Sequence, residues 1–380
     1  MTIQPFTINI PQNTLDDVQD RLARTRWPDE VEGAGWDYGT NLAYLKELAH
    51  YWQHLFDWRQ QEDQLNQFAH FRTEIDGVGI HFIHERGQGP DPQPLLLLHG
   101  WPDSFYRFYK LIPLLTDPAR FGGDPAHSFD VIVPSLPGFG FSDRPINRGG
   151  VDAEGLLARL MTDVLGYTQF GVQGGDLGGA VAKEMASRYP EAVQGLHLTD
   201  IYDATFFLDP TTLSSAEQMY MAQVEQWSAK EGAYGLIQGT KPQTLAYGLN
   251  DSPIGLASWI VEKFHTGSDC GGKLERSFTK DELLTNIMIY WVTETINSSI
   301  RWYYDGMNGH WELAGGANVP SDIPVGIALF PADNPPPREL AERNLNVQRW
   351  TIMPRGGHFA ALEEPELLAE DIRAFFSVLR

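Results

Sequence analysis

The sequence predicts an α/β protein with a mostly parallel, doubly wound sheet, a helical lid and a helical N-terminal extension. Short apolar runs such as "PLLLLHG", "FDVIVPS", "FGVQGG" and "GLHLTD" alternate with helical segments, which is typical of a parallel sheet. The alternation stops between residues 206 and 318, where the patterns are helical, and strands return in "PVGIALFP" and "VQRWTIMP". Before the first buried strand, the chain has helical periodicity.

The N-terminal segments come first in chain order. "NTLDDVQDRLARTRWPDE" places apolar residues at helical spacing between a capping Asn13 or Thr14 and Pro28, and "TNLAYLKELAHYWQHLFDW" is also amphipathic. "FRTEIDGVGIHFIHERG" alternates polar and apolar residues around Asp76 and Gly77, which predicts an edge hairpin. "EEPELLAEDIRAFFSVL" closes the chain as an amphipathic helix. We therefore predict a helical N-terminal region over 1–68, sheet-bearing core segments over 69–205 and 319–380, and a lid over 206–318.

Composition narrows the classes of partner. The 50 acidic and 28 basic side chains give a formal net charge of −22, which disfavours nucleic acid and anionic membrane surfaces as partners. Cys270 is the only cysteine, so an intrachain disulfide is excluded. The chain starts without a signal-peptide pattern, and no apolar run approaches the ~20 residues that span a bilayer. We expect a soluble, cytoplasmic protein.

The stretch "YTQFGVQGGDLGGAVAKEMASRYP" predicts a strand, a tight turn and a helix, with Asp176 at the turn. Gly174 and Gly178 flank Asp176 at the spacing of the nucleophile elbow of α/β-hydrolases, where larger side chains would collide across the turn. The alternative is that Asp176 only caps the helix, a common role for aspartate. A phosphate-binding loop is disfavoured, because neither glycine-rich phosphate motif is present.

An elbow nucleophile needs an acid and a histidine later in the chain, in that order. "MPRGGHFAALEEPE" places His358 after the last predicted strand, and "ALFPADNPPP" places Asp333 after the preceding strand. Carboxyl ends of parallel strands meet at one edge of such a sheet, so these side chains are predicted to meet Asp176. Asp200 in "HLTDIY" also follows a predicted strand and is the competing acid. We favour Asp333.

A carboxylate at the elbow supports a different reaction from a serine. It attacks an electrophilic saturated carbon and becomes the acyl part of an alkyl ester. Water activated by His358 would then attack the carbonyl carbon of Asp176, with an oxyanion hole formed by the backbone N–H groups of Trp101 and Leu177. Epoxides and alkyl halides are the substrates that fit this chemistry.

These two substrate classes differ in their leaving groups. A halide is held by indole or amide N–H donors, whereas an epoxide oxygen opens as an alkoxide and needs an acid. The predicted lid offers phenols that are protonated at neutral pH. The residues alone do not distinguish among the candidates, which are Tyr234, Tyr247, Tyr303 and Tyr304.

The motifs "TRWPDE", "HGWPDS", "GGDLGG", "LNDSPIGLASWIVEKF" and "RGGHFAALEEPELLAEDIRAFF" make the chain closely similar to the microsomal-type epoxide hydrolases over nearly its whole length. The resemblance implies an α/β-hydrolase fold with a helical N-terminal (EHN) region. It implies Asp176 as nucleophile, His358 as base and Asp333 as its acid, where the microsomal enzymes have glutamate. "EGAYGLIQ" and "SSIRWYYDG" match the ring-opening tyrosines at Tyr234 and Tyr303, with Tyr304 as the neighbouring alternative to Tyr303.

The chain departs from the family pattern at two positions. Leu177 stands where tryptophan is usual after the nucleophile, which affects the pocket wall but not the backbone N–H. Asp103 stands where glycine usually follows "HGWP". The resemblance implies hydrolysis of a small-molecule epoxide to a vicinal diol without metal or organic cofactor, in detoxification, catabolism or natural-product biosynthesis, and it is compatible with a homodimer. The alternatives are a haloalkane dehalogenase and a non-catalytic lidded binding protein.

Overall fold

The computed structural model describes residues 2–147, 150–201, 210–309 and 319–379. A 9-stranded sheet has the order β1-β2-β3-β5-β4-β6-β7-β8-β9. The first three ladders in this order are antiparallel, and those from β5 to β9 are parallel, which confirms the predicted α/β-hydrolase sheet. The strands are β1 (Gln4–Pro5), β2 (His70–Ile75), β3 (Val78–Glu85), β4 (Gln93–Leu98), β5 (Phe129–Pro134), β6 (Phe170–Gly174), β7 (Val193–Leu198), β8 (Pro324–Leu329) and β9 (Asn346–Ile352).

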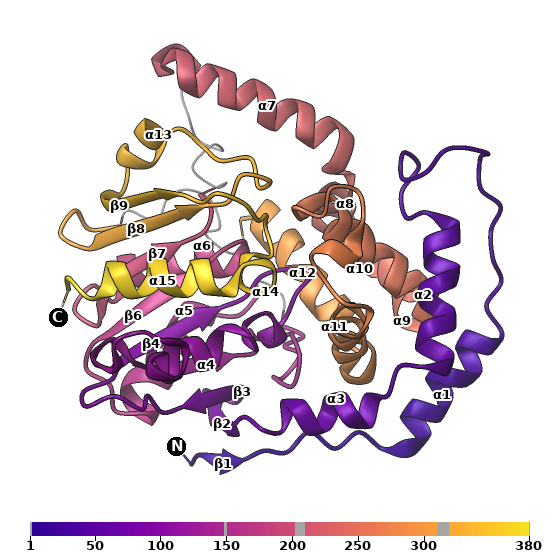
Figure 1. Cartoon of the computed structure of the whole chain (residues 1–380), viewed down its shortest axis with the longest axis horizontal. Coiled ribbons are helices and arrows are strands. Elements are labelled where there is room, and N and C mark those ends of the chain that lie inside the picture. The colour runs from indigo at the N-terminus through magenta and orange to yellow at the C-terminus, as the bar shows by residue number, and fades with distance from the viewer. Residues whose placement is uncertain (1, 148–149, 202–209, 310–318, 380) are drawn as a thin grey trace.

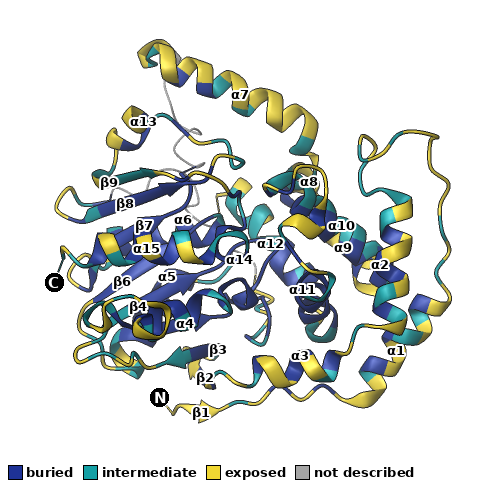
Figure 2. Cartoon of the chain, in the orientation of Figure 1, coloured by how far each residue is buried: buried dark blue, intermediate teal, exposed yellow. Residues whose placement is uncertain are grey.

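Helices cover the parallel part of the sheet (Figure 1). Helix α6 contacts α5 and the strands β4, β6 and β7, while α15 contacts α4, β7 and β8. The central strands are buried between these helices, as the dark blue arrows of Figure 2 show. The four leucines of β4 are at most 1% exposed, as expected of a strand covered on both faces. The core helices are α4 (Leu111–Thr116), α5 (Ala153–Arg159), α6 (Leu177–Arg188), α13 (Arg338–Glu342), α14 (Ala360–Glu363) and α15 (Pro365–Phe376).

The segment predicted as a lid is helical where it is described, although residues 206–209 and 310–318, which include the predicted boundaries, lie outside the described residues. Two helical stretches are each divided. Gly232 ends α7 directly before α8, and Glu294, with a φ of 53°, ends α11 before α12. The helices are α7 (Ser215–Glu231), α8 (Ala233–Thr240), α9 (Pro242–Asp251), α10 (Pro253–Gly267), α11 (Lys280–Thr293) and α12 (Ile296–Met307).

The N-terminal region contains α1 (Gln12–Ala23), α2 (Leu42–His54) and α3 (Trp58–Leu65). These helices contact α10 and α11, and Figure 1 shows α1 and α2 on the far side of the lid from the sheet. The short strand β1, which the helical interpretation did not predict, pairs with β2 at the sheet edge. The predicted hairpin is confirmed: Ile75 pairs with Val78, and both turn residues have positive φ. Among the described residues, the helices are too short or too polar to cross a membrane.

The topology fixes where a site can form. Strand β4 lies between β5 and β6, so the connections that leave β4 and β5 run toward opposite edges of the sheet. Ligands bind at such a switch point, outside the carboxyl ends of the strands. The loop after β4 and the turn after β6 therefore meet at one place, which contains the "HGWP" motif and Asp176.

Candidate active site

The predicted turn around Asp176 is present between β6 and α6. Asp176 has a φ of 54° and a ψ of −132°, a strained conformation for a residue with a side chain. Glycine is required nearby, because a Cβ on Gly178 would lie 2.2 Å from the carbonyl oxygen of Leu98 on β4. Asp176 is also the N-cap of α6, so the capping alternative and the elbow describe the same residue.

The two oxygens of the Asp176 carboxylate have different partners. Oδ1 accepts hydrogen bonds from the backbone N–H of Leu177 at 2.7 Å and of Trp101 at 2.9 Å. Oδ2 lies 3.6 Å from Nε2 of His358. Burial raises the pKa of Asp176, and the His358 charge and the two amides oppose this shift. Both N–H groups predicted for the oxyanion hole therefore point at one oxygen of this side chain.

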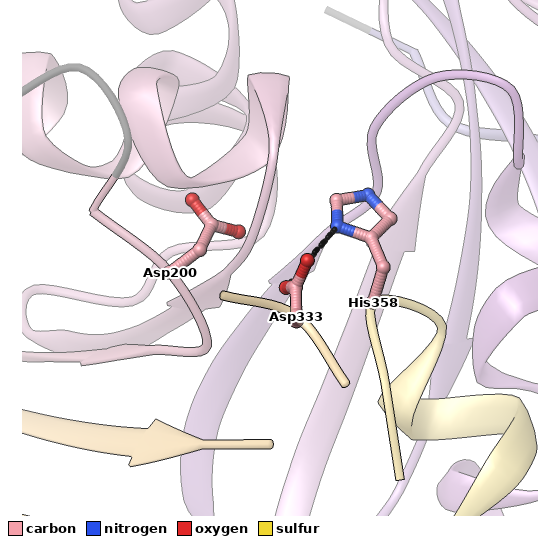
Figure 3. A group of neighbouring side chains, drawn as sticks. All are labelled: Asp200, Asp333 and His358. Carbon is pink, nitrogen blue, oxygen red and sulfur yellow. Dashed lines mark hydrogen bonds and ion pairs between the residues drawn. The ribbon is translucent and has the colours of Figure 1, made fainter. Parts of the chain in front are cut away.

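His358 lies between two carboxylates. Figure 3 shows the contact between its Nδ1 and Asp333, and the distance is 3.2 Å to each carboxylate oxygen. Its Nε2 faces Asp176. Burial alone would lower the pKa of His358, but the charges of Asp333 and Asp176 raise it to about 10. The side chains of His358 and Asp333 are 13% and 10% exposed, so both are largely shielded from water.

Asp200, the competing acid, has another partner. Its Oδ2 accepts the backbone N–H of Asp176 at 2.6 Å and so helps to fix the backbone of the elbow. Burial and then the Asp333 charge raise the pKa of Asp200 to about 7. Ligand atoms of Asp200, Asp333 and His358 lie within 4.8 Å of one another (Figure 3), a spacing that could hold a metal ion. In this structure Nδ1 of His358 faces Asp333, while Asp200 accepts a hydrogen bond from the backbone N–H of Asp176.

Two of the four candidate tyrosines reach the site. The rings of Tyr234 on α8 and Tyr303 on α12 lie 5.9 Å apart, and the indole of Trp101 lies 5.4 Å and 5.8 Å from them. Burial raises the pKa of both phenols, which keeps them protonated. Tyr304 is 36% exposed and Tyr247 is 72% exposed, so the structure does not support Tyr247 as a candidate.

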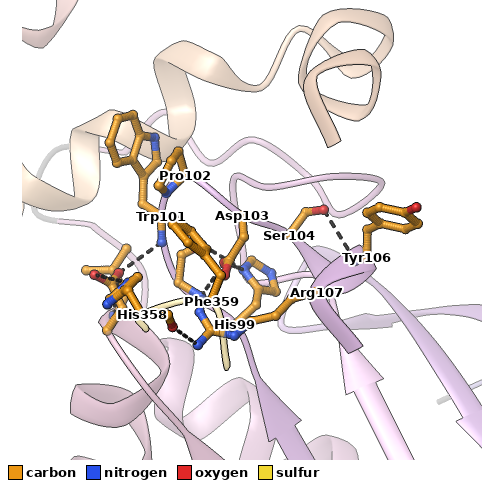
Figure 4. Close-up of polar contacts among 12 residues, drawn as sticks. His99, Trp101, Pro102, Asp103, Ser104, Tyr106, Arg107, His358 and Phe359 are labelled. Atoms are coloured by element: carbon orange, nitrogen blue, oxygen red, sulfur yellow. Dashed lines mark hydrogen bonds and ion pairs between the residues drawn. The ribbon is translucent and has the colours of Figure 1, made fainter. Parts of the chain in front are cut away.

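An ion pair that the sequence did not reveal supports this site (Figure 4). Oδ1 of Asp103 accepts the N–H of Gly100 at 2.9 Å, and Oδ2 forms an ion pair with Arg107. The side chains of Asp103 and Arg107 are each at most 3% exposed. Another guanidinium nitrogen of Arg107 donates to the carbonyl of His358 at 2.6 Å. The pair therefore connects the loop that carries Trp101 to the loop that carries His358. The only sequence signal is an acid and an arginine four residues apart.

The lid also holds the loop after β4, through two residues of α11 to which the sequence analysis assigned no role. Asn286 donates to the carbonyl of Pro102 at 2.8 Å, and the hydroxyl of Tyr290 donates to that of Asp103 at 2.6 Å. His99, at the start of the same loop, is buried in the core, and its Nε2 accepts the N–H of Leu136. These contacts fix the backbone around Trp101.

A strand–turn–helix elbow with a carboxylate at its apex is followed in chain order by an aspartate and by a histidine that lies between the two carboxylates, which places the protein in the α/β-hydrolase class. A family model described as alpha/beta hydrolase fold matches residues 93–243, and one described as epoxide hydrolase N terminus matches residues 3–108.

Similarity to known epoxide hydrolases defines the family more closely. A putative epoxide hydrolase of Stigmatella aurantiaca is 42% identical over 100% of this chain and 86% of its own length. Epoxide hydrolase 1 of Sus scrofa is 40% identical over 100% of this chain and 89% of its own. The crystal structure of juvenile hormone epoxide hydrolase from Bombyx mori superposes with a TM-score of 0.86, at 32% identity, over 100% of this chain and 94% of that one. The chain belongs to the microsomal-type epoxide hydrolases, which confirms the family predicted from its motifs.

Proposed function

We propose that this chain hydrolyses small-molecule epoxides to vicinal diols through an ester on Asp176. The observation that carries the proposal is the unequal environment of the two carboxylate oxygens. Oδ1 is held by the N–H groups of Trp101 and Leu177, whereas Oδ2 faces His358 across 3.6 Å. Oδ2 is therefore the attacking atom, and Oδ1 is the oxygen on which charge later develops. Membership of the epoxide hydrolase family supports the substrate class.

Ring opening is the first step. Oδ2 forms a bond to one epoxide carbon, the bond from that carbon to the ring oxygen breaks, and its electron pair goes to the oxygen. Tyr234 or Tyr303 donates a proton to the resulting alkoxide. Their contact with Trp101 supports this role, because the backbone N–H of the same residue binds Oδ1. The product is a neutral alkyl ester of Asp176.

Hydrolysis of the ester is the second step. Water gives a proton to Nε2 of His358 as its oxygen attacks Cγ of Asp176, and Asp333 stabilises the imidazolium. The negative charge develops on Oδ1, where the two backbone N–H groups stabilise it. The bond between Cγ and Oδ2 then breaks, the leaving alkoxide takes the proton held by His358, and the diol leaves with Oδ2. The proton of the new carboxyl group returns through solvent to the tyrosinate left by ring opening, which restores the enzyme. The water oxygen stays in the Asp176 carboxylate.

Oxygen-18 labelling tests this sequence of bonds. With enzyme in excess over styrene oxide, a single turnover in labelled water should place the label in the peptide that contains Asp176 and leave the diol unlabelled. Label that appears only in the diol would contradict a covalent intermediate. Halide release from an alkyl halide, without epoxide turnover, would instead favour the dehalogenase alternative. The Asp176→Ala variant should turn over neither substrate.

A further inference from the structure

Lys263 of α10 contacts Tyr234, one of the two proposed acids. Its ammonium group lies over the Tyr234 ring, 4.5 Å from the ring centroid, and the residue is only 9% exposed. The ammonium also pairs with Glu262 at 2.7 Å and donates to the carbonyl of Glu231 at 3.2 Å. A buried lysine is costly unless it is paired, so these partners account for its presence but not for its position over the ring.

That position matters for ring opening. A cation over an aromatic face is attracted to the ring, and the attraction grows when both groups are removed from water. A phenol that gives up a proton carries negative charge, part of it on the ring, so the ammonium binds the ring more strongly as the proton leaves. An interaction that strengthens during the reaction accelerates it. The carboxylates beside the ammonium reduce this gain, because they partly cancel its charge.

We infer that Lys263 is a positioning residue for epoxide opening, one that acts through Tyr234 by stabilising the charge that develops on the phenol. The inference rests on the proposed function, because it needs Tyr234 as the proton donor. It assigns Lys263 to the first step only. Hydrolysis of the ester uses His358 and the backbone N–H groups around Asp176, and Lys263 contacts neither in the structure described here.

A purely structural role is the competing explanation. Glu231 is the last residue of α7, and Tyr234, three residues later, is the second residue of α8. The hydrogen bond to the Glu231 carbonyl therefore also connects this helix junction to α10. Loss of this hydrogen bond would displace residue 234 whether it is tyrosine or phenylalanine. Loss of charge stabilisation would matter only when the hydroxyl is present. A double-mutant cycle separates the two explanations.

The experiment measures ring opening and ester hydrolysis separately, by rapid mixing of excess enzyme with styrene oxide. The variants are K263M, which keeps the length and removes the charge, K263R, Y234F and the double variant K263M/Y234F. K280M is the matched control, because Lys280 also lies over a tyrosine ring, at 6.0 Å from that of Tyr51, in ion pairs with Glu47 and Glu275.

K263M should slow ring opening about tenfold and change ester hydrolysis less than about twofold. In the Y234F background the same change should slow ring opening less than about twofold, and K263R should restore most of the rate. Equal slowing in both backgrounds, slowing of both steps, or no effect would overturn the inference.

If K263M does not fold, the E262Q variant tests the same inference. It should open the ring faster, because a negative charge that partly cancels the Lys263 charge is removed, and an unchanged or slower rate would overturn the inference. A wild-type enzyme that forms no ester refutes the proposed function instead.

Discussion

His358 Nε2 lies 3.6 Å from Asp176 Oδ2, so the proposed base and the proposed nucleophile influence each other's charge. The charges of Asp333 and Asp176 raise the pKa of His358 to about 10 against the opposing effect of burial. A base with that pKa is protonated at neutral pH and cannot activate water. Ester formation neutralises Asp176 and removes one of the two charges, so the pKa of His358 falls when its basic form is needed.

The first prediction concerns this change. The rate of ester hydrolysis should rise with pH to a plateau, because it needs neutral His358, and its apparent pKa should lie below about 10, the value for the free enzyme. Rapid mixing to form the ester, followed by a jump to a range of pH values, measures the profile. An apparent pKa at or above that of the free enzyme would contradict the proposed coupling.

Asp333 supplies the second prediction. Asp333→Asn removes the charge that faces Nδ1 of His358 and should slow ester hydrolysis by roughly 10²- to 10⁴-fold. Ring opening needs no base and should be much less affected, so the ester should accumulate and be detectable by mass spectrometry. Asp333→Glu keeps the charge and should retain most activity. A loss of ring opening equal to the loss of hydrolysis would argue against the assigned role.

The fold and the positions of Asp176, Asp333 and His358 could be predicted from sequence, because each depends on a local pattern. The Leu95–Leu98 run, the glycines around Asp176, and the positions of Asp333 and His358 after strands are all visible in one dimension. Strand order then brings the ends of those strands together. The local pattern places both Asp333 and Asp200 after strands, and in the structure Nδ1 of His358 faces Asp333, the acid that we favoured.

Other parts of the site depend on contacts distant in sequence. Arg107 reaches the carbonyl of His358, 251 positions later, and Asn286 reaches the carbonyl of Pro102 from another helix. Tyr303 and Tyr304 are neighbours on α12 and point in different directions from the helix axis. The sequence alone could not determine which of the two faces the site. The domain boundaries, the cytoplasmic location and the homodimer stay predictions.

The tyrosines give a third prediction. Tyr234→Phe and Tyr303→Phe should each slow ring opening by about 10- to 10²-fold, because each phenol can assist the alkoxide, and the double variant should lose most activity. Ester hydrolysis should change little. Tyr304→Phe is the matched control, since Tyr304 is 36% exposed. A large effect of Tyr304→Phe with none of Tyr303→Phe would reverse the assignment.

Asp200 gives a prediction about stability. Burial raises its pKa in the folded protein to about 7, from an ordinary value of 3.8. Between these values the folded chain binds more protons than the unfolded chain, so this group lowers stability as the pH rises from about 4 to about 7. The full effect is at most about 4 kcal/mol.

Asp200→Asn keeps an oxygen that can accept the N–H of Asp176 and does not ionise. Urea unfolding of both proteins at pH 5 and pH 8 should show a smaller loss of unfolding free energy for the variant over this interval. An equal loss in the two proteins would mean that Asp200 stays ionised throughout.

The buried pair of Asp103 and Arg107 gives the last prediction. Arg107→Met leaves the Asp103 charge buried without its partner, which should lower the unfolding free energy by about 3–5 kcal/mol. It also removes the hydrogen bond to the His358 carbonyl, so activity should fall even at temperatures where the variant is folded. Chemical denaturation and single-turnover kinetics on the same preparation measure both effects.

Asp103→Asn combined with Arg107→Met separates the two effects. Removal of both charges should recover much of the stability, because the penalty of an unpaired buried carboxylate disappears. Activity should stay low, since nothing then donates to the carbonyl of His358 from position 107. Recovery of stability and activity together would show that Arg107 acts only by neutralising Asp103, and the link between the two loops would then have no part in catalysis.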